Sequence, residues 1–564
     1  MYLSKSTPSV LLVTLLGILL AASLAACSSQ QQPAGLASGS GQAPEPGRPA
    51  VAQSSALPLE LQILSINDWE GSLEARRRDD RAIGGAAMLA AYLDEWERRA
   101  AGRGASTVRV HAGDMIGASP PISGLLQDEP TIKLLDALRF AYGAVGNHEF
   151  DEGVAELLRL QHGGPHPKTE PVWGPFPGAL FHRYLAANVV WRDTGKPIFP
   201  PYVVHEVEGV GVGFIGVVRR DTPTVVTPAG VREVEFLDEA ETVNGYVDEL
   251  RDLGVRAIVV LLHRGGFGDV DGGPVTRLIV PMIERMSPHV DAVITGDSHQ
   301  GYWGQIAGKL VTQAFAKGEA FGAITLRIDR QSGQVVSKAA EIVRTFHDQA
   351  EFPPDPAVAA MVAEFAAIVA PIVDRVVGSA ASAITRERSP AGESALGNLI
   401  ADAQRWGMGT QIAFMNPGGI RDDVAAGLVT WGQLFNVQPF QNTLIRMTLT
   451  PEQIRRLLEQ QWVGQPFPRI LQVSGITYTW NPLLPEGGRV LAQTVTVGGA
   501  PLETACPCTV TVNSFMAGGG DNFTVLTEPV ERVVGRVDLD VLVDYIATLP
   551  QPFSAAVEGR IRVP

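Results

Sequence analysis

The stretch Gly146-Asn147-His148-Glu149-Phe150-Asp151 follows an apolar run, Ala141 to Val145, in the way that a loop follows a buried strand. Ligand-binding and catalytic groups collect at the carboxyl ends of such strands in α/β folds. Asn147 can offer a carbonyl oxygen to a metal ion, and His148 can protonate a leaving group or stabilise a negative oxygen. Asp151 can orient that imidazole through a hydrogen bond. Taken alone, the stretch is equally well a polar turn, so its meaning depends on the other strand ends.

Polar side chains follow four further apolar runs that have the composition of strands. Amphipathic segments such as Gly84 to Arg99 and Asp238 to Leu253 alternate with these runs, and this β-loop-α order predicts a parallel sheet. We also expect a short strand over Leu185 to Val189 and a helix over Val275 to Met286. The polar strand-end residues are Asp68 and Glu70 after Leu61–Ile66, Asp114 after Thr107–Val110, His263 after Ala257–Leu262, and Asp297 and His299 after Ala292–Thr295.

Each of these residues has an ordinary alternative explanation. A strand-end aspartate often caps a helix, and a strand-end histidine often bonds only to the backbone. Together with Asn147, however, they form a set of oxygen and imidazole donors at successive strand ends. Such a set predicts a binuclear metal site, in which one aspartate bridges two ions about 3.5–4 Å apart that polarise a phosphoryl group and activate water.

The bulk properties set limits on the protein class. A chain of 564 residues is too long for one core, and two domains with additional segments are expected. The net charge of −15 argues against a nucleic-acid polymer as partner. Cys506 and Cys508 flank Pro507; they could pair in an oxidising compartment, but the ring would be strained, and we assign them no function.

The N-terminus has the pattern of an export signal. The apolar run Val10 to Leu20 is too short to span a bilayer comfortably. Leu24-Ala25-Ala26-Cys27 then resembles a bacterial lipobox, which implies cleavage before Cys27 and a lipid on its sulfur; the alternative is a plain secretory signal with an incidental cysteine. Residues 27–57 are rich in Gln, Ser, Gly, Pro and Ala, which is typical of a flexible tether.

The second half of the chain carries a different group of candidate residues. Asp355 to Val377 has apolar residues at helical spacing and predicts a stiff helical linker between domains. Beyond it, Pro417-Gly418-Gly419-Ile420-Arg421 follows a predicted strand, and tight glycines before an arginine suit contact with an anion, although a plain turn is equally possible. Phe440 and Phe515 lie in loops with polar neighbours; they are either minor core anchors or stacking partners for a planar base.

The order Asn67-Asp68, Gly113-Asp114, Gly146-Asn147-His148-Glu149, His263 and Gly296-Asp297-Ser298-His299 resembles the calcineurin-like metallophosphoesterase domain, and more closely the bacterial 5′-nucleotidase/UDP-sugar hydrolase family. The resemblance extends from about Leu59 to the C-terminus. It implies a signal peptide (1–26), the tether, a four-layer α/β/β/α metallophosphoesterase sandwich (58–350), the helical linker (351–377) and an α/β nucleotide-binding domain (378–564).

The resemblance also implies roles for single residues. Asp114 would bridge the ions, Asp68 and His299 would serve one ion, and Asn147 and His263 the other. His148 and Asp151 would form the dyad that acts in the transition state. In the second domain, the implied substrate-binding residues are Arg421 for the nucleotide, Phe440 and Phe515 around its base, Asn442 and Asp521 for base and ribose, and, with looser local spacing, Arg386 and Arg388.

Two positions depart from the family pattern, because Glu70 and Asp297 stand where histidines are usual. Asp68, Glu70, Asp114 and Asp297 would then set about four negative charges against two divalent ions. A site with so many anionic oxygens should prefer harder ions such as Mn or Mg over Zn. We expect Mn to be the favoured ion, with Zn or Mg as alternatives, and an alkaline-shifted optimum.

These observations together predict a lipid-anchored, extracytoplasmic, monomeric phosphoesterase facing the periplasm or the cell exterior. Its expected substrates are nucleoside 5′-monophosphates, with UDP-sugars or cyclic nucleotides as further possibilities. One alternative is a nucleotide-binding lipoprotein whose turnover is weakened by Glu70 and Asp297. Another keeps the metals but changes the substrate, as in the family's thiosulfohydrolase relatives; Phe440 and Phe515 argue against it.

Overall fold

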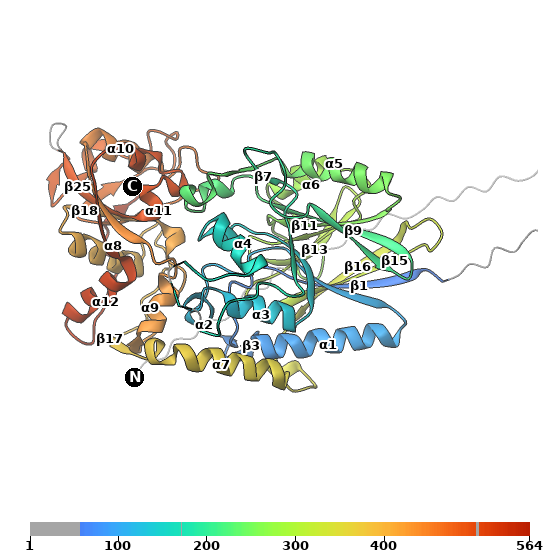
Figure 1. Cartoon of the computed structure of the whole chain (residues 1–564). Helices are drawn as coiled ribbons and strands as arrows, with labels where there is room; N and C mark the ends of the chain where they lie inside the picture. Colours follow the sequence, from blue (N-terminus) through green and yellow to red (C-terminus); the bar gives the residue numbers. More distant parts are fainter. Residues whose placement is uncertain (1–56, 168, 171, 503–506) are drawn as a thin grey trace, which may run out of the picture. The chain divides into compact units, whose positions relative to one another are not determined.

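Two six-stranded sheets form the first half of the described chain (Figure 1). The computed structural model describes residues 57–167, 169–170, 172–502 and 507–564; the expected signal, Cys27, most of the tether and Cys506 lie outside this part. The first sheet has the order β16-β15-β1-β4-β5-β6, with β16 Val335–Arg344, β15 Ala320–Ile328, β1 Leu59–Ile66, β4 Ser106–His111, β5 Phe140–Ala144 and β6 Arg183–Leu185. The second has the order β13-β14-β12-β11-β9-β8, with β13 Gly301–Ile306, β14 Lys309–Ala314, β12 Ala292–Thr295, β11 Ala257–His263, β9 Val210–Val218 and β8 Tyr202–Val207.

The side-chain alternation of β11 shows how the layers form. Val259 and Leu261 pack into a core that both sheets share. Ile258 and Val260 point the other way, into a core with the helices α5 (Glu239–Asp252) and α6 (Ile279–Arg285). The outer face of the first sheet packs against α1 (Ala86–Gly102), α3 (Glu129–Ala137), α4 (Val154–His162) and α7 (Pro356–Val373). This arrangement confirms the predicted four-layer α/β/β/α sandwich.

The register of the parallel strands brings their carboxyl ends together within each sheet. Ile66 of β1 pairs with His111 of β4, and Val218 of β9 pairs with His263 of β11. Leu262 of β11 pairs with Thr295 of β12. The loops that follow these strands therefore leave each sheet at one edge, where the predicted ligand residues lie.

Two predicted elements differ from the structure. The expected strand from Leu185 to Val189 is interrupted between β6 and β7 (Val189–Trp191), because the Asn188 side chain bonds to the Val218 backbone at both its oxygen and its nitrogen. The helix expected from Val275 begins only at Ile279, because Thr276 pairs with the Phe267 backbone instead.

The helix α7 occupies most of the expected linker and packs against the sandwich. Asp355 caps it by accepting a hydrogen bond from Val358 N at 2.8 Å. Val358, Phe365 and Val369 then pack in the same core as α1, beside which α7 runs (Figure 1). Over its 18 residues α7 has a mean hydropathy of 2.0, the length and composition of a membrane span, but its buried face belongs to the core of the sandwich.

A five-stranded mixed sheet follows α7, with the order β21-β18-β25-β20-β26. Phe414 and Met415, adjacent on β18, point into separate cores on the two faces of this sheet. The main elements are β17 Val376–Ala380, α8 Ala395–Met408, β18 Ile412–Met415, β19 Gly427–Thr430, α9 Trp431–Val437, β20 Thr443–Leu449, α10 Pro451–Glu459, β21 Gln472–Ser474, β22 Ile476–Thr479, β25 Cys508–Asn513, α11 Ser514–Ala517, β26 Arg532–Val537 and α12 Asp538–Thr548.

Candidate active site

The loops at the strand ends hold one another through backbone hydrogen bonds. Asp68 N donates to Gly113 O and Glu70 N donates to Asp114 O, both at 3.0 Å. Asp297 N donates to the Asp68 carboxylate at 2.9 Å. Five of the seven predicted ligands have left-handed backbone, with φ of 50° at Asp68, 46° at Glu70, 54° at Asp114, 75° at Asp297 and 56° at His299. Strained backbone of this kind is retained where the surrounding structure fixes it, and it clusters at functional sites.

Two glycines let these loops approach so closely. A Cβ at Gly146 would overlap Asp114 Oδ1, and a Cβ at Gly113, where φ is 86°, would lie 2.6 Å from His263 Nδ1. Side chains at either position would push the Asp114 loop away from its neighbours.

Two triads of potential ligand atoms meet at Asp114. One contains Asp68, Asp114 and His263, and the other contains Glu70, Asp114 and His148; within each, the ligand atoms lie within 4.8 Å of one another. All of these side chains are buried except that of His148, which is 12% exposed. Two clusters that share one carboxylate are a donor set that could hold two ions.

Buried atoms without partners test whether this donor set fits metal ions. Three of the buried atoms that have no hydrogen-bond partner among the described residues lie at this site: Glu70 Oε2, Asn147 Oδ1 and His263 Nε2. Two of them have a charged group nearby, since Lys317 Nζ is 3.5 Å from Glu70 Oε2 and Asp114 Oδ2 is 3.0 Å from His263 Nε2. His263 Nδ1 lies 2.7 Å from Ala112 O, which can only accept, so Nδ1 carries a proton and Nε2, 3.0 Å from Asp114 Oδ2, is the ring atom that could bind an ion. Such atoms are costly to bury unless a ligand satisfies them, so the set fits divalent ions.

The two carboxylates that depart from the family pattern are each bonded to an arginine. Arg421 donates to Glu70 Oε1 at 2.7 Å, and Arg219 donates to Asp297 Oδ1 at 2.8 Å. Burial opposes the ionisation of Glu70, but Arg421, with His299 and Lys317, holds the pKa of Glu70 well below its usual range. The charge count made from the sequence is therefore incomplete, because it omits these cations. The Mn preference drawn from it remains a prediction with a weaker basis.

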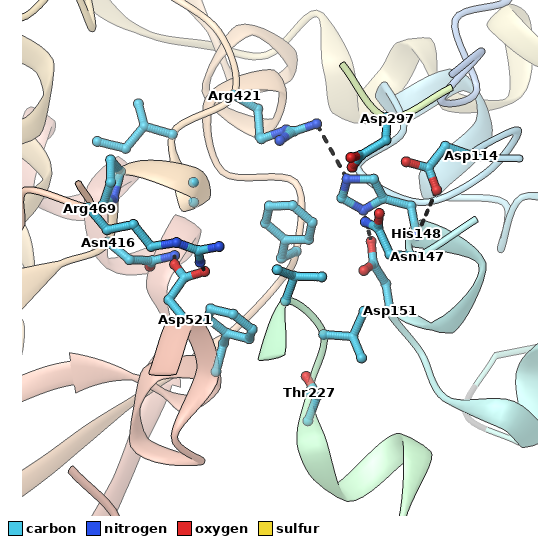
Figure 2. A pocket seen from close by; sticks show the side chains of 18 of the residues that line it. Asp114, Asn147, His148, Asp151, Thr227, Asp297, Asn416, Arg421, Arg469 and Asp521 are labelled. Carbon is cyan, nitrogen blue, oxygen red and sulfur yellow. Dashed lines mark hydrogen bonds and ion pairs between the residues drawn. The ribbon is translucent and has the colours of Figure 1, made fainter. Parts of the chain in front are cut away.

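His148 lies between acidic and cationic groups (Figure 2). Its Nδ1 is 2.7 Å from Asp151 Oδ2, and its Nε2 is 3.5 Å from the Arg421 guanidinium. Burial lowers the pKa of His148, but Asp151 and Asp114 outweigh this and raise it to about 9. The ring of Phe440 stacks on the imidazole, with centroids 6.0 Å apart. The imidazole is thus fixed in orientation and can carry a proton or stabilise a negative oxygen.

A cavity of about 590 Å³ lies beside His148 and is lined by both halves of the described chain. All seven residues predicted to bind substrate line it: Arg386, Arg388, Arg421, Phe440, Asn442, Phe515 and Asp521. Asp114, Asn147, His148, Asp151, Asp297 and His299 contribute from the first half, whereas Asp68, Glu70 and His263 are not among the lining residues. His299 Nε2 lies 3.3 Å from Glu70 Oε1 and 3.4 Å from Asp68 Oδ1.

Some of these residues also serve the local structure. Asn442 Oδ1 accepts from Ser514 Oγ and Phe515 N at 2.9 and 3.2 Å, which fixes the start of α11. Asp521 accepts from Asn416 at 2.9 Å and pairs with Arg469. Arg386 donates to Ile420 O at 3.3 Å, and burial together with nearby Arg386 lowers the pKa of Arg388.

Sequence reasoning missed several residues around the cavity, among them Arg219, Arg469 and Phe467, and also Lys317 beside Glu70. The position of Arg219 directly after β9 carried a usable signal, since polar residues at the other strand ends were singled out for the same reason. Arg469 and Phe467 lie in a loop with no motif of their own.

Glu149, the residue after His148, was also missed, and it joins the two loops that carry the site. It is fully buried, and its carboxylate accepts from three backbone N–H groups and from the Tyr184 hydroxyl. The distances are 2.9 Å from Asp114 N, 2.8 Å from Met115 N, 2.5 Å from Gly146 N and 3.2 Å from Tyr184 Oη. Glu149 therefore holds Asp114 against the His148 loop.

Replacing Glu149 by alanine should destabilise the protein by about 3 kcal/mol or more, because three buried N–H groups would lose their acceptor. Tyr184→Phe, which removes one longer bond, should cost about 1 kcal/mol. Urea unfolding followed by tryptophan fluorescence measures both changes. If Glu149→Ala lowered the free energy of unfolding by less than about 1 kcal/mol, this would contradict the inference that Glu149 holds the two loops together.

A layered sandwich with a carboxylate shared by two potential ion sites, facing an aromatic and arginine-lined pocket, defines a two-domain metallophosphoesterase. Comparisons with known proteins agree. The family model of the 5′-nucleotidase C-terminal domain matches residues 376–528. The crystal structure of a 5′-nucleotidase precursor from Thermus thermophilus has a TM-score of 0.74 and 30% identity, and the match covers 90% of this chain and 99% of that one.

Two curated bacterial proteins are also similar. The cell wall protein Lmo0130 of Listeria monocytogenes is 35% identical over 88% of this chain and 68% of its own length. The endonuclease YhcR of Bacillus subtilis is 37% identical over 90% of this chain, which spans only 41% of YhcR. The chain therefore belongs to the 5′-nucleotidase family, in which a calcineurin-like domain precedes the C-terminal domain, as the sequence motifs predicted.

Proposed function

We propose that this protein is a metal-dependent phosphoesterase that hydrolyses nucleoside 5′-monophosphates to nucleoside and phosphate. The observation that carries the proposal is the cavity shared by His148 and Asp114 on one side and by Phe440, Phe515 and Arg421 on the other. A base stacked on aromatic rings would have its phosphate directed towards the strand-end carboxylates.

Two divalent ions would be held by Asp68, Glu70, Asp114, Asn147, His263 and His299, with Asp114 shared between them. Bound there, the ions supply Lewis-acid polarisation of the phosphoryl group and an activated water. We leave Asp297, whose carboxylate accepts from Arg219, out of this proposed set. Mn remains the ion we expect to be favoured.

The residues of the chain have distinct tasks in this proposal. His148, oriented by Asp151, stabilises charge on the transferring phosphoryl group or delivers a proton to the leaving oxygen. Arg421, which reaches both Glu70 and His148, binds the phosphate oxygens. Phe440 and Phe515 bind the base, and Asp521 and Asn442 bind the ribose and base edges. Arg386 and Arg388 add positive charge to the wall of the cavity.

A second candidate function is nucleotide binding with little or no turnover. It is favoured by the contact of Glu70 with Arg421, which competes with a metal ion for this carboxylate. UDP-sugars and cyclic nucleotides remain further candidate substrates. We also propose that the protein acts outside the cytoplasm, anchored by a lipid on Cys27; the similarity to a cell wall protein supports the compartment.

Phe515→Ala tests whether nucleotides are the substrates. Loss of one stacking partner should raise KM for AMP about tenfold or more, because base stacking on an aromatic ring contributes about 1–3 kcal/mol. Hydrolysis of p-nitrophenyl phosphate, which has no nucleobase, is the control and should change less than twofold. Steady-state assays with both esters measure the effect, and an equal loss for both substrates would argue against base stacking.

A further inference from the structure

Arg219 is held firmly at the edge of the candidate active site. It directly follows β9, and its backbone N–H donates to His263 O at 3.1 Å. Its Nε and Nη2 donate to the two oxygens of Asp221 at 2.9 and 2.7 Å, and its Nη1 donates to Asp297. An arginine fixed on three sides loses little further freedom when it binds a ligand.

This arginine also faces the cavity. A guanidinium has five N–H donors, and the contacts with Asp221 and Asp297 use three of them. The side chain is 12% exposed and lines the cavity together with Asp114 and His148. Two donors are therefore left for a ligand in the cavity.

A second arginine approaches from the other half of the chain. Arg469 lines the same cavity, and burial, together with the nearby charge of Arg219, lowers the pKa of Arg469 to about 10. Arg469 also pairs with Asp521, and Asp221 and Asp297 offset part of the repulsion between the two guanidinium groups. An anion between the two groups would offset more of this repulsion.

Asp297 is arranged to serve Arg219. Its backbone N–H donates to Asp68, which turns the loop towards the ion site, while its carboxylate accepts from Arg219. The loop thus contacts the ion site through its backbone and the arginine through its side chain.

We propose that Asp297 is a positioning residue for Arg219, and that Arg219 and Arg469 together bind phosphate oxygens of the nucleotide between the ion site and the base pocket. The inference rests on the proposed function, because it assigns these residues to the same substrate. It explains why a carboxylate at position 297 occurs with an arginine at position 219.

The test compares binding, not turnover. The metal-loaded protein is titrated calorimetrically with adenosine 5′-(α,β-methylene)diphosphate, whose bridging carbon cannot be hydrolysed, and separately with adenosine. Arg219→Gln should weaken binding of the phosphonate about tenfold or more and leave adenosine binding unchanged. Arg219→Lys, which keeps the charge, should lose less. Arg264→Gln is the matched control, because Arg264 contacts Asp221 without lining this cavity, and it should alter both affinities less than twofold.

The metal content of a variant shows whether Asp297 is a metal ligand or a positioning residue for Arg219. Asp297→Asn should retain its ions, measured by mass spectrometry of the dialysed protein, while weakening phosphonate binding severalfold. Loss of one ion per chain in this variant, or unchanged phosphonate affinity in Arg219→Gln, would overturn the inference and leave the proposed function intact. Failure of the unsubstituted protein to bind either compound would instead overturn the inference and the proposed function together.

Discussion

Replacing Asp114 by asparagine should reduce phosphate release from AMP by at least about 1000-fold. Asp114 is the only residue common to both triads of potential ligand atoms in the described chain, so its loss would weaken both proposed ion sites at once. Changes to residues that merely orient metal ligands cost about 10–100-fold in metal affinity or activity, and a shared ligand should cost more. Asparagine keeps the size of the side chain and an oxygen that can accept from His148 N, now 2.8 Å away, so the fold should survive.

Activity and metal content are measured together for this variant. We expect both to fall, with a thermal unfolding midpoint close to that of the unsubstituted protein when both are compared without metal. Asp136→Asn is the matched control, because Asp136 also holds a loop through backbone N–H groups but lies outside the site. Full activity of Asp114→Asn would refute the shared-ligand arrangement.

Replacing His148 by glutamine should lower kcat for AMP about 100- to 10,000-fold, the usual contribution of a positioned acid–base group. His148 lies 2.7 Å from Asp151 and next to the cavity, and its orientation is fixed on both sides by Asp151 and Phe440. Because the proposed role is in the chemical step, the bound ions and the affinity for adenosine should change little. Asp151→Asn should give a smaller loss, since the imidazole remains present but is less well oriented.

Metal content distinguishes His148→Gln, which should keep its ions, from Asp114→Asn, which should lose them. His289→Gln, at an exposed histidine, is the control and should leave kcat unchanged. If His148→Gln lost its ions together with its activity, His148 would be a metal ligand, as its place in one of the triads allows, and not an acid–base residue.

The strand ends carry local signals that predicted a parallel sheet, and the resemblance of their motifs to a known family implied the sandwich. Apolar runs followed by Asp68, Asp114, Asn147 or His263 can be recognised locally, and the parallel register then brings these ends together. The interruption at Asn188 could not be seen, because it depends on bonds to residues 30 and 49 positions away.

The electrostatics of the site could not be predicted in the same way. Glu70 bonds to Arg421, 351 positions later, and Asp297 bonds to Arg219, 78 positions earlier. Counting carboxylates along the sequence therefore overstated the negative charge around the proposed ions. Glu149 was passed over for a related reason, since its importance lies in backbone donors from two loops.

The contact between Glu70 and Arg421 links the two halves of the site. The same guanidinium lies 5.9 Å from the Phe440 ring and 3.5 Å from His148. We expect a nucleotide phosphate that enters the cavity to take over some of these hydrogen bonds. The substrate would therefore be bound by residues of both domains at once.

Release of inorganic phosphate from AMP by the purified protein tests the central claim most directly. The protein is assayed after chelation and dialysis, and again after the addition of Mn, Mg or Zn. We expect no release without metal and restored release with at least one of these ions, together with saturable dependence on AMP. Saturable binding of AMP without phosphate release in the presence of any of these ions would contradict the proposed hydrolysis and favour the binding-protein alternative.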